Sequence, residues 1–274
     1  MSLLIEMRND ASTRRQIRSL MDAHEQERSD RISDHRLDLI YKNAGRVIAG
    51  AQARILCGNC YVSLLFVIPE ERKRGLGSSL MNELRSFQMR MQAARMSPST
   101  RDVEAKRFFD EREMTVDGRI RHCPTPYTLA FYSGTPRFKK VRVTPADTLL
   151  KNAGITPKDR VELSERIATD PVMGRSDSPL TLALTDREKE VKGGLIGSIR
   201  AGCLEIEALI VSSSLRGQGY GKALLEALEA YGKEKGIRRL FVRPFCFHDR
   251  GFFSHLGYRR FETPCHDVFT RSLE

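Results

Sequence analysis

The sequence predicts an α/β fold made of two similar domains in tandem. A strand, a glycine-rich turn and a helix-like run occur twice, and the turn at 72–78 recurs at 216–222 after a constant shift of 144 residues. The same shift relates the aromatic pair at 108–109 to the pair at 252–253. A long fixed period is typical of a duplicated unit. With 274 residues, the chain is long enough for two domains that each bury a core.

The first domain is expected to span residues 1–135 and the second residues 138–274, with a turn cluster at 134–136 between them. Apolar spacing of 3 or 4 predicts helices and short apolar or alternating runs predict strands. For the first domain, these patterns predict a helix within 11–31, strands at 37–41, 47–56 and 60–67, a helix over 78–94, a weak strand at 96–100, a helix over 102–113 and a strand at 127–132.

The second domain is expected to open with a strand at 138–143. Thr156 and Asp159 have the spacing of a helix N-terminal cap, and Gly236 marks a helix C-terminus. The remaining pattern predicts a helix over 156–168, strands at 180–184, 194–200 and 204–211, a helix from the second glycine turn to Gly236, a strand at 237–242, a helix over 249–256 and a strand at 258–261.

Composition is ordinary for a globular protein, with 40% hydrophobic and 30% charged residues. No apolar stretch reaches the roughly 18 residues of a membrane span, and the first ten residues are too soon charged for a secretory signal. We therefore expect a cytoplasmic protein with no membrane partner. The six cysteines lie in apolar surroundings, as reduced buried cysteines do. The pair Cys57 and Cys60 has metal-binding spacing but lacks a second such pair, so we expect no metal.

The net charge of +11 raises the question of a nucleic-acid partner. The excess is shared evenly, +6 over residues 1–137 and +5 over 138–274, without a basic tail. A solvated basic surface explains such a balance, and an acidic or RNA-bearing acceptor stays open.

The second glycine turn is the most informative stretch of the chain. Glycines at 217, 219 and 221 let a backbone approach a pyrophosphate closely. The helix that follows offers unpaired N–H groups, expected at 222–225, and the positive end of its dipole. Arg216 either contacts the phosphate or braces the turn. The spacing matches neither the dinucleotide fingerprint nor the P-loop.

Arg-x-x-Gly-x-Gly between an apolar strand and a helix resembles the acyl-CoA signature of the GNAT superfamily of N-acetyltransferases. The run Gly251-Phe-Phe-Ser-His-Leu-Gly-Tyr258 is similar to a second motif of that family. The resemblance covers residues 180–262 and, through the repeat, residues 47–132 less well. It implies that each domain holds a mixed, largely antiparallel sheet flanked by helices, and that acetyl-CoA is the co-substrate.

The resemblance also implies that the strand before the turn splays from its neighbour and binds the pantetheine arm through its backbone. A backbone N–H there would polarise the thioester carbonyl. The residues expected to bind the cofactor are Leu209, Ile210, Val211, Arg216, Gly217, Gln218, Gly219, Tyr220, Gly221 and Lys222.

Amide formation needs a neutral amine, and hence a general base. Glu205 and Glu207 lie two apart on the strand before the turn and so on one face. The first domain has Tyr61 and Ser63 at these positions, which cannot serve as carboxylate bases. We therefore expect the second domain to be catalytic and the first to be degenerate or non-catalytic.

The general acid is less clear from the sequence. Family members often use a tyrosine where this chain has Phe253, and the first domain has Phe109. His248 is our first choice as a substitute, ahead of Cys246 and Tyr258, and no acid is required if the thiolate leaves unaided.

The expected function is acetyl transfer from acetyl-CoA to a primary amine by direct attack. The acceptor, whether small molecule or protein, is not encoded legibly. Aminoacyl-tRNA stays open as an acceptor that the basic balance permits, and the two domains would form a pseudo-dimer. The alternative is a non-catalytic protein that senses CoA or docks to a nucleic acid.

Overall fold

The structure is a computed structural model of the whole chain. Its described residues are 3–28, 35–56, 58–100, 103–112, 114–121, 128–134, 144–170, 178–200, 203–242, 250–262 and 267–273.

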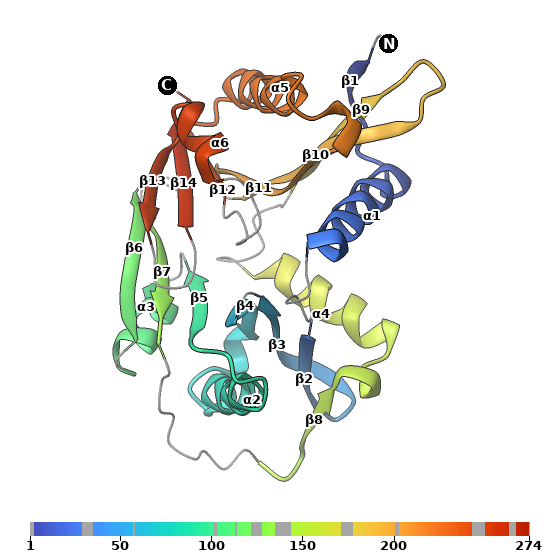
Figure 1. Cartoon of the computed structure of the whole chain (residues 1–274). Coiled ribbons are helices and arrows are strands. Elements are labelled where there is room, and N and C mark those ends of the chain that lie inside the picture. Colours follow the sequence, from blue (N-terminus) through green and yellow to red (C-terminus); the bar gives the residue numbers. More distant parts are fainter. Residues whose placement is uncertain are drawn as a thin grey trace.

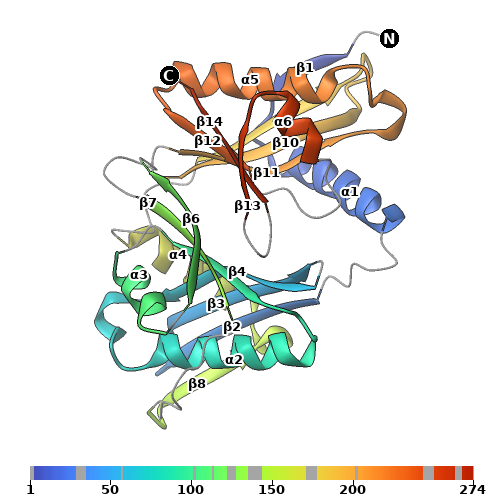
Figure 2. The ribbon, with the colours of Figure 1, turned by 60° about the vertical axis from the view of Figure 1, so that its left-hand side comes forward.

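Two seven-stranded mixed sheets organise the molecule (Figure 1, Figure 2). The first has the order β6-β7-β5-β4-β3-β2-β8 and the second the order β1-β9-β10-β11-β12-β14-β13. The first contains β2 (His35–Asn43), β3 (Arg46–Leu56), β4 (Asn59–Val67), β5 (Met96–Thr100), β6 (Thr115–Arg121), β7 (Thr128–Ser133) and β8 (Asp147–Lys151). The second contains β1 (Leu4–Met7), β9 (Ser178–Thr185), β10 (Val191–Arg200), β11 (Cys203–Val211), β12 (Arg239–Val242), β13 (Arg259–Glu262) and β14 (Asp267–Ser272).

Helices cover both faces of each sheet. In Figure 1 α2 and α5 lie on the outer faces, and α1 and α4 lie on the faces turned toward the other half. The helices are α1 (Ala11–Arg28), α2 (Leu76–Arg90), α3 (Val103–Asp110), α4 (Pro157–Thr169), α5 (Tyr220–Glu234) and α6 (Arg250–His255). The predicted α/β class, with two mixed sheets flanked by helices, is confirmed.

The two halves exchange their first strand and helix. β1, from the N-terminus, pairs antiparallel with β9, while β8, from the start of the second repeat, pairs antiparallel with β2. α1 packs on β10 and β11, and α4 packs on β3. The duplicated sequence segments, 1–135 and 138–274, are therefore not the segments that fold into one sheet each.

A glycine in each sheet receives the exchanged helix. A Cβ on Gly194 would lie 2.5 Å from Cδ1 of Ile17 in α1, and one on Gly50 would lie 2.7 Å from Cδ2 of Leu163 in α4. Gly50 and Gly194 are related by the shift of 144 residues. Since only glycine allows so close an approach, the two helix seats are built alike.

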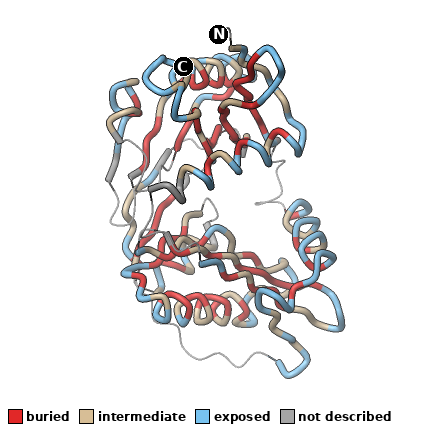
Figure 3. The backbone as a smooth tube through the Cα atoms, turned by 45° about the vertical axis from the view of Figure 1, so that its right-hand side comes forward, coloured by how far each residue is buried: buried red, intermediate tan, exposed pale blue. Residues whose placement is uncertain are grey.

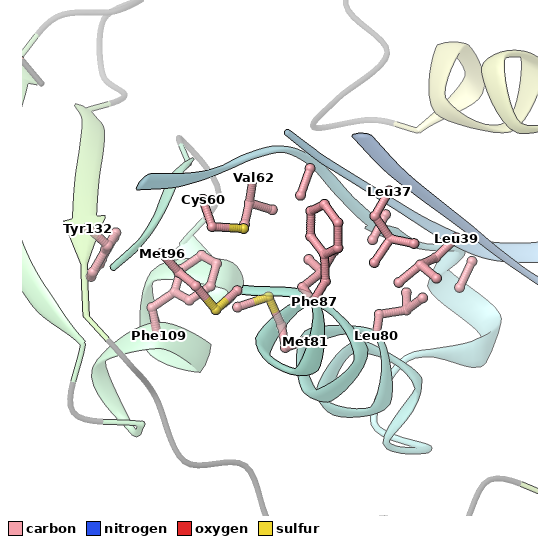
Figure 4. Packing of buried hydrophobic residues seen from close by; sticks show 14 of the residues in the cluster. Leu37, Leu39, Cys60, Val62, Leu80, Met81, Phe87, Met96, Phe109 and Tyr132 are labelled. Atoms are coloured by element: carbon pink, nitrogen blue, oxygen red, sulfur yellow. The ribbon is translucent and has the colours of Figure 1, made fainter. Parts of the chain in front are cut away.

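Each half has its own core. In the first, apolar residues of the sheet pack against α2 (Figure 4), and buried residues follow the sheets and the inner sides of the helices (Figure 3). The residues labelled in Figure 4 are Leu37, Leu39, Cys60, Val62, Leu80, Met81, Phe87, Met96, Phe109 and Tyr132. A small third cluster joins the halves, because Phe131 of β7 packs with Cys203, Phe241 and Val268 of the second sheet.

Several sequence predictions need correction or stay untested. β1, β6, β8 and β14 were not predicted, and the expected strand at 138–143 lies outside the described residues. Cys203 is disulfide-bonded, so the expectation of reduced cysteines is wrong for this residue, whereas Cys60 is free and buried. No described helix is long and apolar enough to cross a membrane.

Candidate functional site

The second glycine turn requires left-handed backbone at two positions. Gly217 has φ +77° and Gly219 has φ +85°, and a Cβ at either would meet nothing within 4 Å. These glycines are needed for backbone conformation, because L side chains are strained at such φ values. Glycine is favoured at position 221 for another reason, since an added Cβ would lie 3.2 Å from the ring of Phe252 in α6.

The turn ends in unpaired amides at the start of α5. The first helical bond runs from the N–H of Ala223 to the carbonyl of Gly219 (3.0 Å), and Gly219 caps the helix without a side-chain bond. The amides from Gly219 to Lys222 therefore have no intrahelical partner. They lie earlier than the expected 222–225, because α5 begins at Tyr220. Together with the helix dipole they form a site suited to a phosphate.

Arg216 braces the turn. Its Nε donates to the carbonyl of Val211 (2.9 Å), which ties the turn to the end of β11. Arg72 makes the same bond to Val67 in the first half (3.1 Å). The side chain thus performs the bracing role, one of the two roles considered from the sequence.

The other predicted cofactor residues lie around the same turn. Nε2 of Gln218 donates to the carbonyl of Ser214 (3.2 Å), and Tyr220 packs against the core under α5. The ammonium of Lys222 lies 3.6 Å from Glu226, with both side chains well exposed. Lys222 is therefore positioned to exchange this weak surface pair for a ligand phosphate.

The described part of β12 pairs with only the first part of β11. The two strands pair in parallel from Cys203–Ile206 to Arg239–Val242, whereas β10 continues to pair with β11 as far as Val211. Residues 243–249, which follow β12 in the sequence, lie outside the described ranges. The splay expected beside Leu209, Ile210 and Val211 therefore stays a prediction.

A β-bulge lies at Glu207 of β11, opposite β10. β10 pairs Ile196 with Ala208 and Gly197 with Ile206, so Glu207 is left without an opposite residue. Such bulges redirect a side chain and often lie beside active sites. The first half has the equivalent bulge at Ser63, because β3 pairs Gln52 with Leu64 and Ala53 with Val62.

Glu205 and Glu207 differ in access. Leu204 and Ile206 pack in the core under α5, so the two carboxylates point to the opposite face, as alternation predicted. Glu205 is buried, at 7% exposure, whereas the Glu207 side chain retains 31%. Glu207 is therefore the more accessible acceptor for a proton.

Arg18 of α1 contacts Glu207 and was missed in the sequence analysis. Its Nη2 lies 3.3 Å from Oε2 of Glu207, and the two residues are 189 positions apart. No local motif marks Arg18. The signal that could have found it is the resemblance between the α1 and α4 segments, since Ile17 and Leu163 occupy equivalent glycine seats.

The candidate general acids are only partly placed. His248 and Cys246 lie outside the described residues. Phe253 is buried and packs edge-to-face against Tyr258. The Tyr258 hydroxyl donates to Glu229 of α5 (2.8 Å), and burial, followed by that bond, raises the pKa of Tyr258 far above its usual value. Tyr258 is therefore a packing residue and a poor proton donor.

The first glycine turn has the same backbone but different side-chain contacts. Gly75 has φ +89° and Lys73 has φ +65°, matching Gly219 and Gly217. Nη2 of Arg72 donates to the buried carboxylate of Asp170 (2.6 Å). Arg74 forms ion pairs with two further acids, Glu71 and Asp147. Arg72 and Arg74 are thus already neutralised by acids of the protein.

No cluster of three or more His, Cys, Asp or Glu side chains suited to a metal occurs in the described part of the chain. Cys57 of the predicted CxxC pair lies outside that part.

Comparison with known proteins finds one family. The Acetyltransferase (GNAT) family matches residues 3–112 and again residues 154–258. Mouse (Mus musculus) N-alpha-acetyltransferase 80 is 42% identical over 57 residues, which cover 20% of this chain and 17% of that protein. The chain therefore matches only a small part of this relative.

The solved structures found by comparison include bacterial acetyltransferases. A putative acetyltransferase from Agrobacterium tumefaciens is 19% identical, with a TM-score of 0.45, over 48% of this chain and 98% of that one. An acetyltransferase from Bacillus cereus ATCC 14579 is 26% identical, with a TM-score of 0.34, over 42% of this chain and 87% of that one. Escherichia coli YhbS, solved in complex with CoA, is 21% identical, with a TM-score of 0.30, over 35% of this chain and 59% of that one.

Proposed function

The chain belongs to the Acetyltransferase (GNAT) family, and we propose that it is an acetyl-CoA-dependent N-acetyltransferase. The acceptor is a primary amine on a small molecule or a protein. The second sheet, which carries β11 and the turn at 216–222, is the catalytic one.

A single observation carries the proposal: β11 runs into a glycine turn that ends in amides without intrahelical partners. If β11 splays from its neighbour as the sequence predicts, Leu209, Ile210 and Val211 offer backbone groups for the pantetheine amides. The amides from Gly219 to Lys222, at the positive end of α5, suit the diphosphate. A linear ligand with a diphosphate at one end and an amide-bearing arm at the other fits this sequence of donors and acceptors.

The reaction is a direct transfer. The amine nitrogen attacks the thioester carbonyl carbon and forms a tetrahedral intermediate. When the intermediate collapses, the carbon–sulfur bond breaks, and the products are an amide and the CoA thiolate. A backbone N–H near the bulge at Glu207 would stabilise the oxyanion.

Glu207 acts as the general base in this proposal. A lysine-like amine has a pKa of about 10.4 and is protonated at neutral pH, so its proton must be removed before attack. Glu207 is exposed enough to take that proton directly or through a water, and Glu205 is the second candidate. His248 remains our proposed donor to the departing thiolate.

The first half supports the catalytic half without catalysing transfer itself. It has Tyr61 and Ser63 where the second half has carboxylates. Arg72 and Arg74 of its turn are paired with acids. The exchanged elements and the shared cluster at Phe131 tie the halves together, so we describe them as a pseudo-dimer within one chain.

The test is release of thiol from acetyl-CoA in the presence of a panel of primary amines. The wild-type protein should release thiol only when an amine is present. Gly219→Val should abolish the release, since both the left-handed backbone and the amide positions change. Gly75→Val puts the same strain at the matching position of the first half and should retain activity. A protein that binds acetyl-CoA but releases no thiol with any amine is a sensor, and that result would overturn the proposal.

A further inference from the structure

We propose that Arg14 and Arg18 of α1 select acceptors in which the primary amine lies close to a carboxylate or phosphate. This inference rests on the proposed acetyl transfer at Glu207 and names the class of amine that the site accepts. The selecting helix comes from the start of the chain, although the catalytic strand belongs to the second repeat.

The exchange places α1 beside the proposed base. Ile17 sits over Gly194, and Met21 packs with Ala208 and Ile210 of β11. α1 therefore lies against the stretch of strand that contains the bulge. Arg18 reaches Glu207 from this helix, with Nη2 at 3.3 Å from the carboxylate, and 58% of the arginine side chain stays exposed. Since Arg18 uses one nitrogen, its other donors remain available to a ligand.

Arg14 lies one turn earlier on the same flank of α1, because residues i and i+4 are neighbours on a helix. Its side chain is partly buried and makes no hydrogen bond or ion pair with any residue in the described ranges. Two guanidinium groups on one flank repel each other. A ligand anion placed between them would relieve that repulsion, and guanidinium groups match the geometry of carboxylates and phosphates.

The equivalent helix of the other half, α4, provides a comparison for the arginines of α1. Superposing the seats of Ile17 and Leu163 aligns Arg14 with Arg160 of α4. Arg160 is paired with Asp38 of β2. Asp38 lies opposite Gln52 in β3, and the matching position, opposite Ile196 in β10, is Thr181. The arginine is therefore kept in both halves, but its internal acid is absent only where the carboxylate base is present.

The charged residues Arg18 and Glu207 are also replaced by uncharged residues in the other half. The same superposition aligns Arg18 with Ser164, and the shift of 144 aligns Glu207 with Ser63. The catalytic half thus has two arginines and one carboxylate where the other half has one neutralised arginine and two serines. A cationic amine would lie at Glu207 while its anionic group lies at Arg14, and Arg18 lies between the two.

The test compares acceptors that differ in one charge. Phosphoethanolamine with ethanolamine, and β-alanine with β-alaninamide, are matched pairs, and an acidic peptide with a free N-terminus provides a macromolecular arm. The wild type should show a lower KM for the charged member of each pair. Arg14→Ala should raise the KM for charged acceptors about tenfold or more, the usual effect of removing a charge-assisted bond, and change the KM for neutral acceptors less than about twofold.

Arg15→Ala is the matched control, because it removes the same charge from the next, exposed position of α1. It should leave both KM values near those of the wild type. Arg18→Ala should raise the KM for charged acceptors and also lower kcat, since Glu207 loses the contact that positions it. Thermal unfolding of each variant would show that the fold is kept.

The outcomes separate the two proposals. If no amine is acetylated by wild-type protein that binds acetyl-CoA, the proposed function fails. If amines are acetylated but the charged and neutral members have equal KM values, the inference alone fails. It also fails if Arg15→Ala raises the KM for charged acceptors as much as Arg14→Ala does, because the effect would then be general attraction.

Discussion

The two halves of the molecule share a backbone and differ in a few charged contacts. Both have a glycine turn with left-handed residues, a bulge in the preceding strand and a glycine that seats the exchanged helix. In the first half Asp170, Asp147 and Asp38 neutralise the nearby arginines. In the second half Arg216 and Arg14 occupy the places of Arg72 and Arg160, and no acid in the described part of the chain forms an ion pair with either, while Gln218 replaces Arg74. A carboxylate, Glu207, stands at the bulge. The two halves thus share a scaffold, and the difference in charges supports the proposed assignment of catalysis to the second half.

Replacing the carboxylate at the bulge should have the largest effect on activity. Glu207→Gln keeps the size of the side chain and removes the proton acceptor, so we expect kcat to fall about 10²-fold to 10⁴-fold. Ser63→Ala, at the equivalent bulge of the first half, should leave kcat unchanged. Steady-state thiol release for both variants checks the pair. Full turnover in Glu207→Gln would remove this residue from the mechanism.

Truncating the helix residue that packs over a glycine, Ile17 in α1 or Leu163 in α4, should have the largest effect on stability. Ile17→Ala and Leu163→Ala each empty the space beside a glycine, and loss of a buried Ile or Leu costs about 2–5 kcal/mol. Chemical denaturation of both variants measures this. Because α1 lies against β11, only Ile17→Ala should also lower activity. Equal losses of activity in the two variants would show that the helix seats do not distinguish the halves.

Acid should weaken the N-terminal caps of the exchanged helices. Thr156 and Asp159 form a capping box, and Lys42 bonds Asp159; these bonds, that of Lys42 first, lower the pKa of Asp159 to about 2. A carboxyl whose pKa is lower in the folded state stabilises the fold above its unfolded pKa of about 3.9 and loses that contribution as the pH falls toward 2. Asp159→Asn should flatten the dependence of unfolding free energy on pH in this range. An unchanged slope would argue against the capping contacts.

In α1, the other exchanged helix, the N-terminal cap is Asp10 itself. Oδ1 of Asp10 accepts from the N–H of Thr13 (2.8 Å), and Oδ2 accepts from its hydroxyl (2.8 Å). The backbone bond, as the larger cause, lowers the pKa of Asp10. Both halves therefore protect their exchanged helix by an ionised aspartate, and Asp10→Asn should also flatten part of the acid-side slope.

Removing the Tyr258 hydroxyl should have the smallest effect. Tyr258→Phe loses the bond to Glu229, which is worth about 1 kcal/mol, and keeps the packing against Phe253. The first half has Met114 at this position, so the hydroxyl is not required by the fold. We expect unchanged kcat and an unchanged pH profile. A large fall in kcat would make Tyr258 the general acid after all.

Local features of the site could be predicted from the sequence. The turn at 216–222 and the helix that follows depend on glycine spacing and strand order within about 40 residues. The side chains of Glu205 and Glu207 share a face because strand alternation is a local rule. Features that depend on local backbone geometry were therefore predicted from the sequence.

The exchange could not be predicted in the same way. α1 and α4 each place an apolar residue, Ile17 or Leu163, over a glycine, so the apolar pattern does not identify the sheet that each helix joins. Which sheet each helix joins is decided by pairing of short edge strands, β1 with β9 and β8 with β2, over long sequence separations. The contact of Arg18 with Glu207 follows from that pairing, so it was invisible to local reasoning.

Counting acetyl-CoA sites by calorimetric titration tests the central claim most directly. The account predicts one site per chain, lost in Gly219→Val and retained in Gly75→Val. Two sites in the wild type, or loss of binding in Gly75→Val alone, would contradict the assignment of the cofactor to the second half.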